Sequence, residues 1–164
     1  MANQIANQIA PDFEMRYPDA SARATECSMQ LVFTADLLVK RIASLLQPFE
    51  LSPAAGLALS TVTDAASPLP PNQIADRLII SRASATSLID TLERRGYVQR
   101  RPHQADRRML LVEVTERGRQ VANAFRPIVH QQERVWLETL NEEEQRRLIE
   151  LLQRLQTTLM DSET

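Results

Sequence analysis

The chain has 164 residues, which suits one compact domain or two small lobes that share a core. No apolar run approaches the ~18 residues that a membrane-spanning helix needs, and the N-terminal segment lacks the basic and continuous apolar regions of a signal peptide. The single cysteine, Cys27, excludes an internal disulfide and favours a reducing compartment. We therefore expect a cytoplasmic protein with no membrane partner.

Charge is distributed unevenly along the chain. The formal net charge is −2, yet the segment from Arg77 to Arg108 contains eight arginines and only three acids. This segment carries +5, so the rest of the chain must carry −7. A basic patch on an otherwise acidic protein indicates a site for a polyanion, and the alternative is a solvated charged face without a partner. The arginines are Arg77, Arg82, Arg94, Arg95, Arg100, Arg101, Arg107 and Arg108.

The N-terminal third predicts an arm followed by a long helix. Residues 1–20 are polar and interrupted by prolines, which indicates a flexible arm. From about residue 21 to residue 49, apolar side chains recur at spacings of three and four, which predicts a helix with a broad apolar face. Ser52 followed by Pro53 predicts the start of a second helix, which ends before the sequence PLPP.

The centre of the chain predicts two short helices and a hairpin. The first helix covers about residues 71–78 and the second about residues 82–95, with Ser81 as N-cap and Gly96 in the left-handed position that follows a helix end. The period then changes to two, which predicts paired strands at about 97–101 and 108–114. This order is typical of a winged helix-turn-helix.

Two further helices complete the predicted elements. Thr115 is the expected N-cap of a long helix, and Asn141 is that of a last helix with leucines at spacings of four and three. These flanking helices are too long to bury their apolar faces on a small lobe, so we expect a homodimer. The alternative is an intramolecular helical bundle.

The predicted fold class is mainly α: an α+β winged helix with a two-stranded β wing, flanked by long N- and C-terminal helices. We expect four parts in chain order. They are a flexible arm (1–20), an N-terminal dimerisation helix (21–50), a winged helix-turn-helix DNA-binding lobe (51–115) and C-terminal helices that complete the dimerisation lobe (116–161).

The second helix of such a motif lies in the major groove of DNA, with its N-terminal residues nearest the base edges. Arg82 can bind a guanine bidentately, a contact worth roughly 1–3 kcal/mol of discrimination. Its outward-facing neighbours are small or carry hydroxyls, which allows close approach, although these hydroxyls could instead belong to a solvated face. The candidate DNA-binding residues of this helix are Ser81, Arg82, Ala83, Ser84, Thr86 and Ser87.

Two segments, LIDTLERRGYVQRR (88–101) and ADRRMLLVEVTERGR (105–119), resemble in sequence and spacing the winged helix-turn-helix core of the MarR family of bacterial regulators. The resemblance is strong over about residues 51–120 and looser over about 22–160. It implies a homodimer whose terminal helices form the dimer lobe and whose two wings straddle a palindromic operator in double-stranded DNA. It also implies a regulator, most often a repressor, that a small aromatic or anionic ligand releases from DNA.

Two positions depart from the family pattern. Ile79 stands in the helix-turn-helix turn where members often carry glycine, so the turn must either avoid positive φ or bear strain. Pro70 stands where a serine or threonine usually caps the short helix.

Asp106, Arg107 and Arg108 match the Asp-x-Arg motif that the family carries in its wing. An arginine fits the narrow, electronegative minor groove, and a nearby carboxylate can hold its guanidinium in place. The resemblance implies that Asp106 holds Arg108 in the groove while Arg107 binds a phosphate, although which arginine enters is open. The alternative is a surface salt bridge of almost no energetic value. Arg100 and Arg101 point to opposite sides of their strand, so at most one faces DNA, and Arg101 is the candidate.

Two alternatives to a ligand-released DNA-binding regulator stay open. A winged helix can serve protein contacts alone, without DNA. Peroxide-sensing members of the family carry a reactive cysteine near the position of Cys27, which makes redox sensing the second alternative. No P-loop, HExxH or paired CxxC motif occurs, so we expect neither an enzyme nor a cofactor or metal site.

Overall fold

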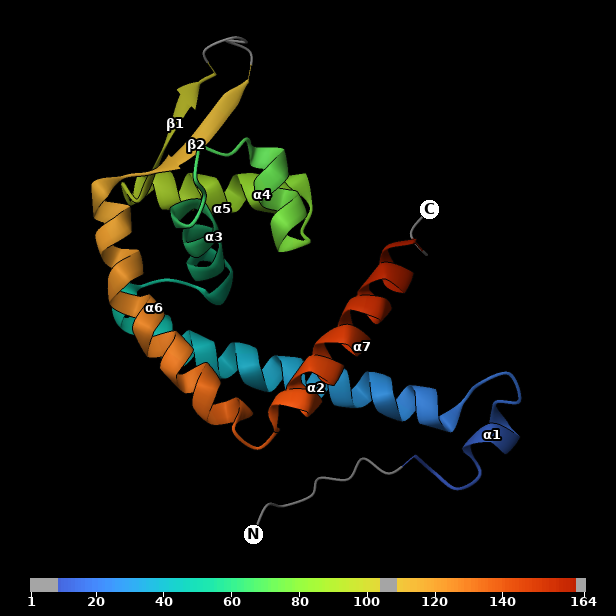
Figure 1. Ribbon diagram of the computed structural model, residues 1–164. Coiled ribbons are helices and arrows are strands. Elements are labelled where there is room, and N and C mark those ends of the chain that lie inside the picture. Colours follow the sequence, from blue (N-terminus) through green and yellow to red (C-terminus); the bar gives the residue numbers. More distant parts are fainter. Residues whose placement is uncertain (1–8, 104–108, 162–164) are drawn as a thin grey trace. The chain divides into compact units, whose positions relative to one another are not determined.

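The computed structural model describes residues 9–103 and 109–161, and the chain divides into two compact units after Ala54 (Figure 1). The predicted mainly helical winged helix, with its two-stranded hairpin and long terminal helices, is confirmed. The elements are α1 (Phe13–Arg16), α2 (Ala22–Leu46), the short 3-10 helix η1 (Gln47–Phe49), α3 (Pro53–Thr63), α4 (Pro71–Leu78), α5 (Arg82–Arg94), β1 (Val98–Pro102), β2 (Leu110–Val114), α6 (Glu116–Leu137) and α7 (Glu142–Asp161).

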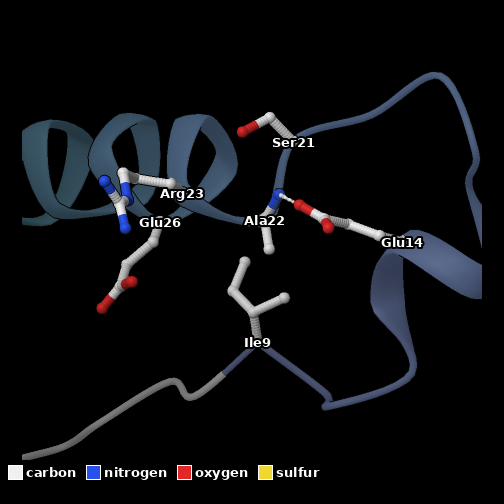
Figure 2. Close-up of a pocket in the computed structure, with 6 residues that line it drawn as sticks. All are labelled: Ile9, Glu14, Ser21, Ala22, Arg23 and Glu26. Carbon is white, nitrogen blue, oxygen red and sulfur yellow. Dashed lines mark hydrogen bonds between the residues drawn. The ribbon is translucent and has the colours of Figure 1, made fainter.

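In the first unit, α2 begins where the sequence predicts and has two caps. Ser21 Oγ accepts a hydrogen bond from the Ala24 amide at 3.2 Å. Glu14, in α1, accepts one from the Ala22 amide at 3.0 Å, the bond drawn in Figure 2. Both acceptors satisfy amides that the first helical turn leaves unpaired, and Glu14 adds negative charge at the positive end of the helix. Part of the N-terminal segment therefore contacts α2 through one helical turn, which the sequence analysis does not predict.

In the second unit, local signals set the bounds of α4 and α5. Pro71 occupies the first position of α4, where a proline loses no helical hydrogen bond. At the far end of α5, Gly96 has φ +71°, and the amides of Gly96 and Tyr97 donate to the carbonyls of Glu93 and Leu92 at 2.8 and 2.9 Å. This pair of bonds is the Schellman arrangement, in which a left-handed residue closes the helix. The chain consequently turns directly from α5 into β1.

Leu69, which precedes α4, attaches the hairpin to the helices through a backbone bridge. β1 and β2 pair antiparallel, with Val98 opposite Val114 and Pro102 opposite Leu110. Leu69, between α3 and α4, forms an isolated antiparallel bridge with Val112, and their amides and carbonyls exchange hydrogen bonds of 2.8 and 2.9 Å. Val112 thus hydrogen-bonds to Leu69 on one side and lies opposite Arg100 of β1 on the other, which fixes the hairpin against the helical part of the lobe.

The core of the second unit lies between α3, α4, α5 and one face of the hairpin. The side chains of Leu59, Ile74, Ile89, Leu92, Val98 and Val112 are fully buried in it. Each of these elements contributes its apolar positions to the same interior, so the lobe presents its polar positions outward. Arg126 of α6 also pairs with Asp64, which follows α3, at 2.7 Å and links α6 to the lobe.

Thr115 joins the hairpin to α6. Its Oγ1 accepts a hydrogen bond from the Gly118 amide at 3.0 Å, which confirms the predicted N-cap, and donates one to the Gly96 carbonyl at 2.6 Å. Its backbone amide donates to the Tyr97 carbonyl at 3.0 Å. The start of α6 is thus tied to the turn that ends α5.

Replacing Thr115 with valine should lower the free energy of unfolding by about 1–2 kcal/mol, the usual cost of a lost N-cap. Valine keeps the volume and β-branching but can neither accept from Gly118 nor donate to Gly96. Urea denaturation followed by circular dichroism measures the change. The matched control is Thr61→Val, since the Thr61 hydroxyl donates only to the carbonyl of Leu57 within its own helix. Equal stabilities of the two variants would contradict the assignment.

Asn141 caps α7 and confirms the predicted N-cap. Its side chain accepts hydrogen bonds from the amides of Glu143 and Glu144 at 3.0 Å, while Glu144 accepts one from the Asn141 amide, as in a capping box.

The two C-terminal helices expose large apolar side chains. On α6, Phe125 and Val129 are buried. The exposed apolar residues of these two helices include Ile128, Val135, Leu137, Leu148, Ile149, Leu151, Leu155, Leu159 and Met160.

Long helices here are not membrane spans. None of the described helices, including the 25-residue α2, combines the length and the apolar content that crossing a bilayer requires.

Candidate nucleic-acid interface

The N-terminal half of α5 presents its polar residues to solvent. Ser81 Oγ accepts the Ser84 amide at 3.1 Å and lies 2.8 Å from the Ser84 hydroxyl, so the predicted N-cap is confirmed. Ala85, Ile89 and Leu92 face the core and anchor the opposite side of the helix. The six residues predicted from the sequence share the exposed face: Ser81, Arg82, Ala83, Ser84, Thr86 and Ser87.

These exposed side chains differ in how much hydrogen-bonding capacity is left for a partner. The Thr86 hydroxyl donates to the Arg82 carbonyl at 2.9 Å, so it can offer a partner only its lone pairs. The Arg82 guanidinium makes no hydrogen bond or ion pair with any other described residue, and the Ser87 hydroxyl likewise has none. Arg82 thus offers five N–H donors at the exposed first turn of α5.

The turn before α5 is strained. Ile79 has φ +53° and ψ +49°, the left-handed helical conformation, and its side chain is 57 % exposed. For a residue other than glycine this conformation costs roughly 1–2 kcal/mol. The structure therefore settles the question that the sequence leaves open: the turn does not avoid positive φ. Pro70, the second departure from the family pattern, provides no side-chain hydrogen bond to α4.

Arg100 connects the hairpin to α5. It lies on the same face of the hairpin as Val98 and Val112, and that face packs on the core. Its guanidinium contacts Asp90 at 2.6 Å and Glu93 at 2.5 Å, and its backbone amide donates to Glu93 at 3.0 Å. Burial disfavours the charged guanidinium, but the hydrogen bonds and the charges of the two carboxylates outweigh burial and raise the pKa of Arg100 above its ordinary value. Arg100 is thereby the shared counter-ion of both acids of α5 and offsets one of their two negative charges.

Arg101 lies on the other face of the hairpin and is half-exposed. Its guanidinium is 3.0 Å from a carboxylate oxygen of Glu113, whose other oxygen accepts a hydrogen bond from Gln99 at 2.6 Å. The predicted opposition of the two neighbouring arginines is therefore confirmed, with Arg100 turned to α5 and Arg101 turned outward. Arg101 remains accessible to a phosphate, although Glu113 offsets part of its charge.

The three wing residues Asp106, Arg107 and Arg108 lie outside the described residues. The described part of the hairpin ends with the His103 amide donating to the Met109 carbonyl at 2.9 Å. Their predicted roles stay predictions.

Cys27 is exposed in the second turn of α2. Within the described part of the chain, no side chain forms a hydrogen bond with its sulfur. Reactive thiols are usually activated by such partners or by a nearby positive charge, so redox sensing also stays a prediction.

The hollows in the described surface are open and polar. The one in Figure 2 has a volume of about 690 Å³ and lies beside the start of α2. Its lining consists of Ile9, Glu14, Ser21, Ala22, Arg23 and Glu26. Ligand sites of small molecules are concave and mainly apolar, which this hollow is not. Among the described residues, no group of three or more His, Cys, Asp or Glu side chains is arranged to hold a metal ion.

A model of the MarR family matches residues 49–109, the segment that contains the helix-turn-helix and the first hairpin strand, β1. This segment of the chain is therefore similar to the MarR family. It includes the exposed face of α5 and the two arginines of β1, Arg100 and Arg101.

Curated relatives agree with this similarity. The chain is 33 % identical over 92 residues to the HTH-type transcriptional regulator PecS of Dickeya dadantii, covering 56 % of this chain and 55 % of PecS. It is 31 % identical over 84 residues to the HTH-type transcriptional repressor YetL of Bacillus subtilis, covering 51 % of this chain and 50 % of YetL. The match therefore spans about half the length of these two relatives.

A solved structure extends the likeness of fold beyond the matched segment. The MepR–DNA complex of Staphylococcus aureus superimposes with a TM-score of 0.75, covering 80 % of this chain and 96 % of the MepR chain. The sequences are 21 % identical, so this likeness concerns the fold alone.

Proposed function

We propose that this protein is a MarR-type transcriptional regulator that binds double-stranded DNA as a homodimer, with α5 in the major groove and the wing at the minor groove. The observation that carries the proposal is the exposed start of α5. Arg82, without a partner among the described residues, and small hydroxyl-bearing neighbours lie there on one accessible face. The core side of the same helix is fully packed, so the helix can enter a groove as a rigid element.

The charge of the lobe supports the same proposal. Arg100 pairs with both Asp90 and Glu93, the two acids of α5, and so reduces their combined charge from −2 to −1. Arg77 and Arg82 are exposed on either side of the helix-turn-helix turn. The described surface thus combines exposed cations with paired anions, as a polyanion site requires.

The homodimer is supported by the apolar side chains that the long helices expose. On α2, Val32 and Leu37 are 65 % and 62 % exposed, and on α7 Leu159 is 60 % exposed. Exposed apolar faces of this extent are typical of interfaces between protein chains. A symmetric dimer would place two copies of α5 one helical turn of DNA apart, on a palindromic operator.

Repression and release by a small aromatic or anionic ligand belong to the proposal as well. Repression is supported by the word "repressor" in the name of YetL, of which this chain matches about half. Release by a ligand rests on the resemblance of residues 49–109 to the MarR family.

The decisive experiment selects DNA from a random duplex library with the purified full chain and sequences the bound fraction. We expect a palindrome with half-sites about 10–10.5 base pairs apart, and a selected duplex that binds with an affinity that falls steeply with salt. A chain that enriches no sequence and binds duplexes only weakly would overturn the proposal. It would favour a winged helix that makes protein contacts alone.

Arg108→Ala should lower the affinity for the selected operator by at least about tenfold, because the variant loses the arginine proposed for the minor groove. The dimer should remain folded, since the proposed role involves only DNA. Fluorescence anisotropy titration measures the affinity, and circular dichroism measures the fold. The control is Arg154→Ala on α7, which removes an exposed arginine outside the proposed DNA interface. Normal operator affinity of Arg108→Ala would contradict the role assigned to it.

A further inference from the structure

Ile79 combines three properties that are energetically unfavourable together in the folded protein. It is β-branched, its backbone is left-handed with φ +53° and ψ +49°, and its side chain is 57 % exposed. β-Branched residues are among those least suited to this conformation, whereas glycine adopts it freely. Strained residues persist where surrounding structure enforces them, and they concentrate at functional sites.

The turn does not need the Ile79 side chain for its own geometry. Its hydrogen bonds are made by backbone groups: the Ile79 amide donates to the Asp76 carbonyl at 3.3 Å, and the Ile80 amide to the Ala75 carbonyl at 3.1 Å. A glycine at position 79 would keep both bonds and remove the strain. Ile80, the next residue, is half-buried and serves the packing of the turn. The exposed part of Ile79 therefore contributes little to the folded lobe.

The position of Ile79 places this apolar side chain inside the proposed DNA-binding surface. It lies between Arg77, in the last turn of α4, and Arg82, in the first turn of α5, and both arginines are exposed. A duplex that α5 enters would meet this turn at the edge of the groove. DNA offers apolar groups there, namely the thymine C5-methyl and the carbons of deoxyribose.

We propose that Ile79 is an additional DNA-contacting residue, which places an apolar side chain against a thymine methyl or a deoxyribose beside the base contacts of α5. The inference rests on the proposed DNA-binding function. The left-handed backbone directs the side chain away from the core, and the strain is the cost of presenting an isoleucine where a glycine would fold more easily.

The test compares the wild type with Ile79→Gly and Ile79→Asn. Asparagine tolerates the left-handed conformation, so it keeps the turn while removing the apolar contact. Both variants should melt at the same temperature as the wild type or about 2–4 °C higher. Both should bind the selected operator about five- to tenfold more weakly, the range of one lost apolar contact. The slope of affinity against salt should stay unchanged, because no phosphate contact is removed.

A second arm distinguishes the two apolar groups of DNA. Deoxyuridine replaces each operator thymine in turn, which removes only the methyl group. If Ile79 contacts a methyl, one replacement weakens the wild type and leaves Ile79→Gly unaffected. If Ile79 contacts a deoxyribose, each deoxyuridine replacement changes the affinity of the wild type and of Ile79→Gly by the same factor. Both Ile79 variants still bind the unmodified operator more weakly than the wild type.

The control is Glu50→Gly, which relieves the other left-handed non-glycine residue among those described, φ +55°, outside the proposed interface. It should leave operator affinity unchanged. Wild-type affinity of both Ile79 variants for an operator that the wild type binds would overturn this inference alone. Failure of the wild type to bind any selected duplex would overturn the proposed function itself.

Discussion

Replacing Gly118 with alanine is expected to lower the free energy of unfolding by about 3–4 kcal/mol. A Cβ on Gly118 would lie 1.9 Å from the carbonyl oxygen of Tyr97 and 2.7 Å from its carbonyl carbon. These are backbone atoms, so no side-chain rotation can relieve the overlap. Alanine is ordinarily the better helix former by roughly 1 kcal/mol, and the steric conflict reverses this preference.

The damage should spread to the junction between the hairpin and α6. Moving Tyr97 away from Gly118 would also stretch the bond from the Thr115 amide to the Tyr97 carbonyl. Urea denaturation measures the loss of stability. The control is Gly96→Ala, where the nearest atom to the added Cβ is the end of the Arg117 side chain at 4.0 Å. That variant bears only the left-handed strain of about 1–2 kcal/mol. A Gly118→Ala variant as stable as Gly96→Ala would refute the close contact.

Arg100→Met is expected to weaken operator binding by about thirtyfold or more, equivalent to roughly 2 kcal/mol. Methionine keeps the aliphatic part of the side chain but leaves Asp90 and Glu93 without their shared counter-ion. Two uncompensated carboxylates on α5 would then repel the phosphates of the groove. The free energy of unfolding should fall by about 1–2 kcal/mol, because a half-buried ionic hydrogen-bond network loses one partner.

One rescue variant separates the effect of charge from that of position. Adding Asp90→Asn and Glu93→Gln to Arg100→Met removes both free charges while keeping side chains of similar size. If repulsion causes the loss, the triple variant recovers most of the operator affinity. If Arg100 acts mainly by holding β1 against α5, affinity stays low although the charges are gone. Unchanged affinity of Arg100→Met itself would show that the ion-pair network has no part in DNA binding. Anisotropy titrations at two salt concentrations provide these comparisons.

The sequence predicts most of the element bounds because local signals determine them. Pro71 starts α4, Ser81 and Thr115 cap α5 and α6, and Gly96 closes α5. Each of these residues acts on backbone groups within a few positions of itself, so a single sequence is enough to read its effect.

Contacts between distant residues were beyond the reach of the sequence. The bridge of Leu69 to Val112 joins positions that no local rule connects, and a lone leucine between two prolines carries no strand pattern. The alternation of β1 predicts that Arg100 and Arg101 face opposite ways, but it cannot show that Asp90 and Glu93 of α5 receive Arg100. For Ile79 the sequence identifies the conflict, and only the backbone angles show that it is resolved as strain.

The two hydrogen bonds between Val112 and Leu69 have a mechanical consequence for the hairpin. Together with the burial of Val98 and Val112 they give it a stiff root, while Pro102 and Leu110, farther from the core, are exposed. Along the described part of the hairpin, stiffness therefore decreases outward, because the density of packed contacts does. Under the proposed function, the outer ends of the two strands would adjust to a groove without transmitting the deformation to the core of the lobe.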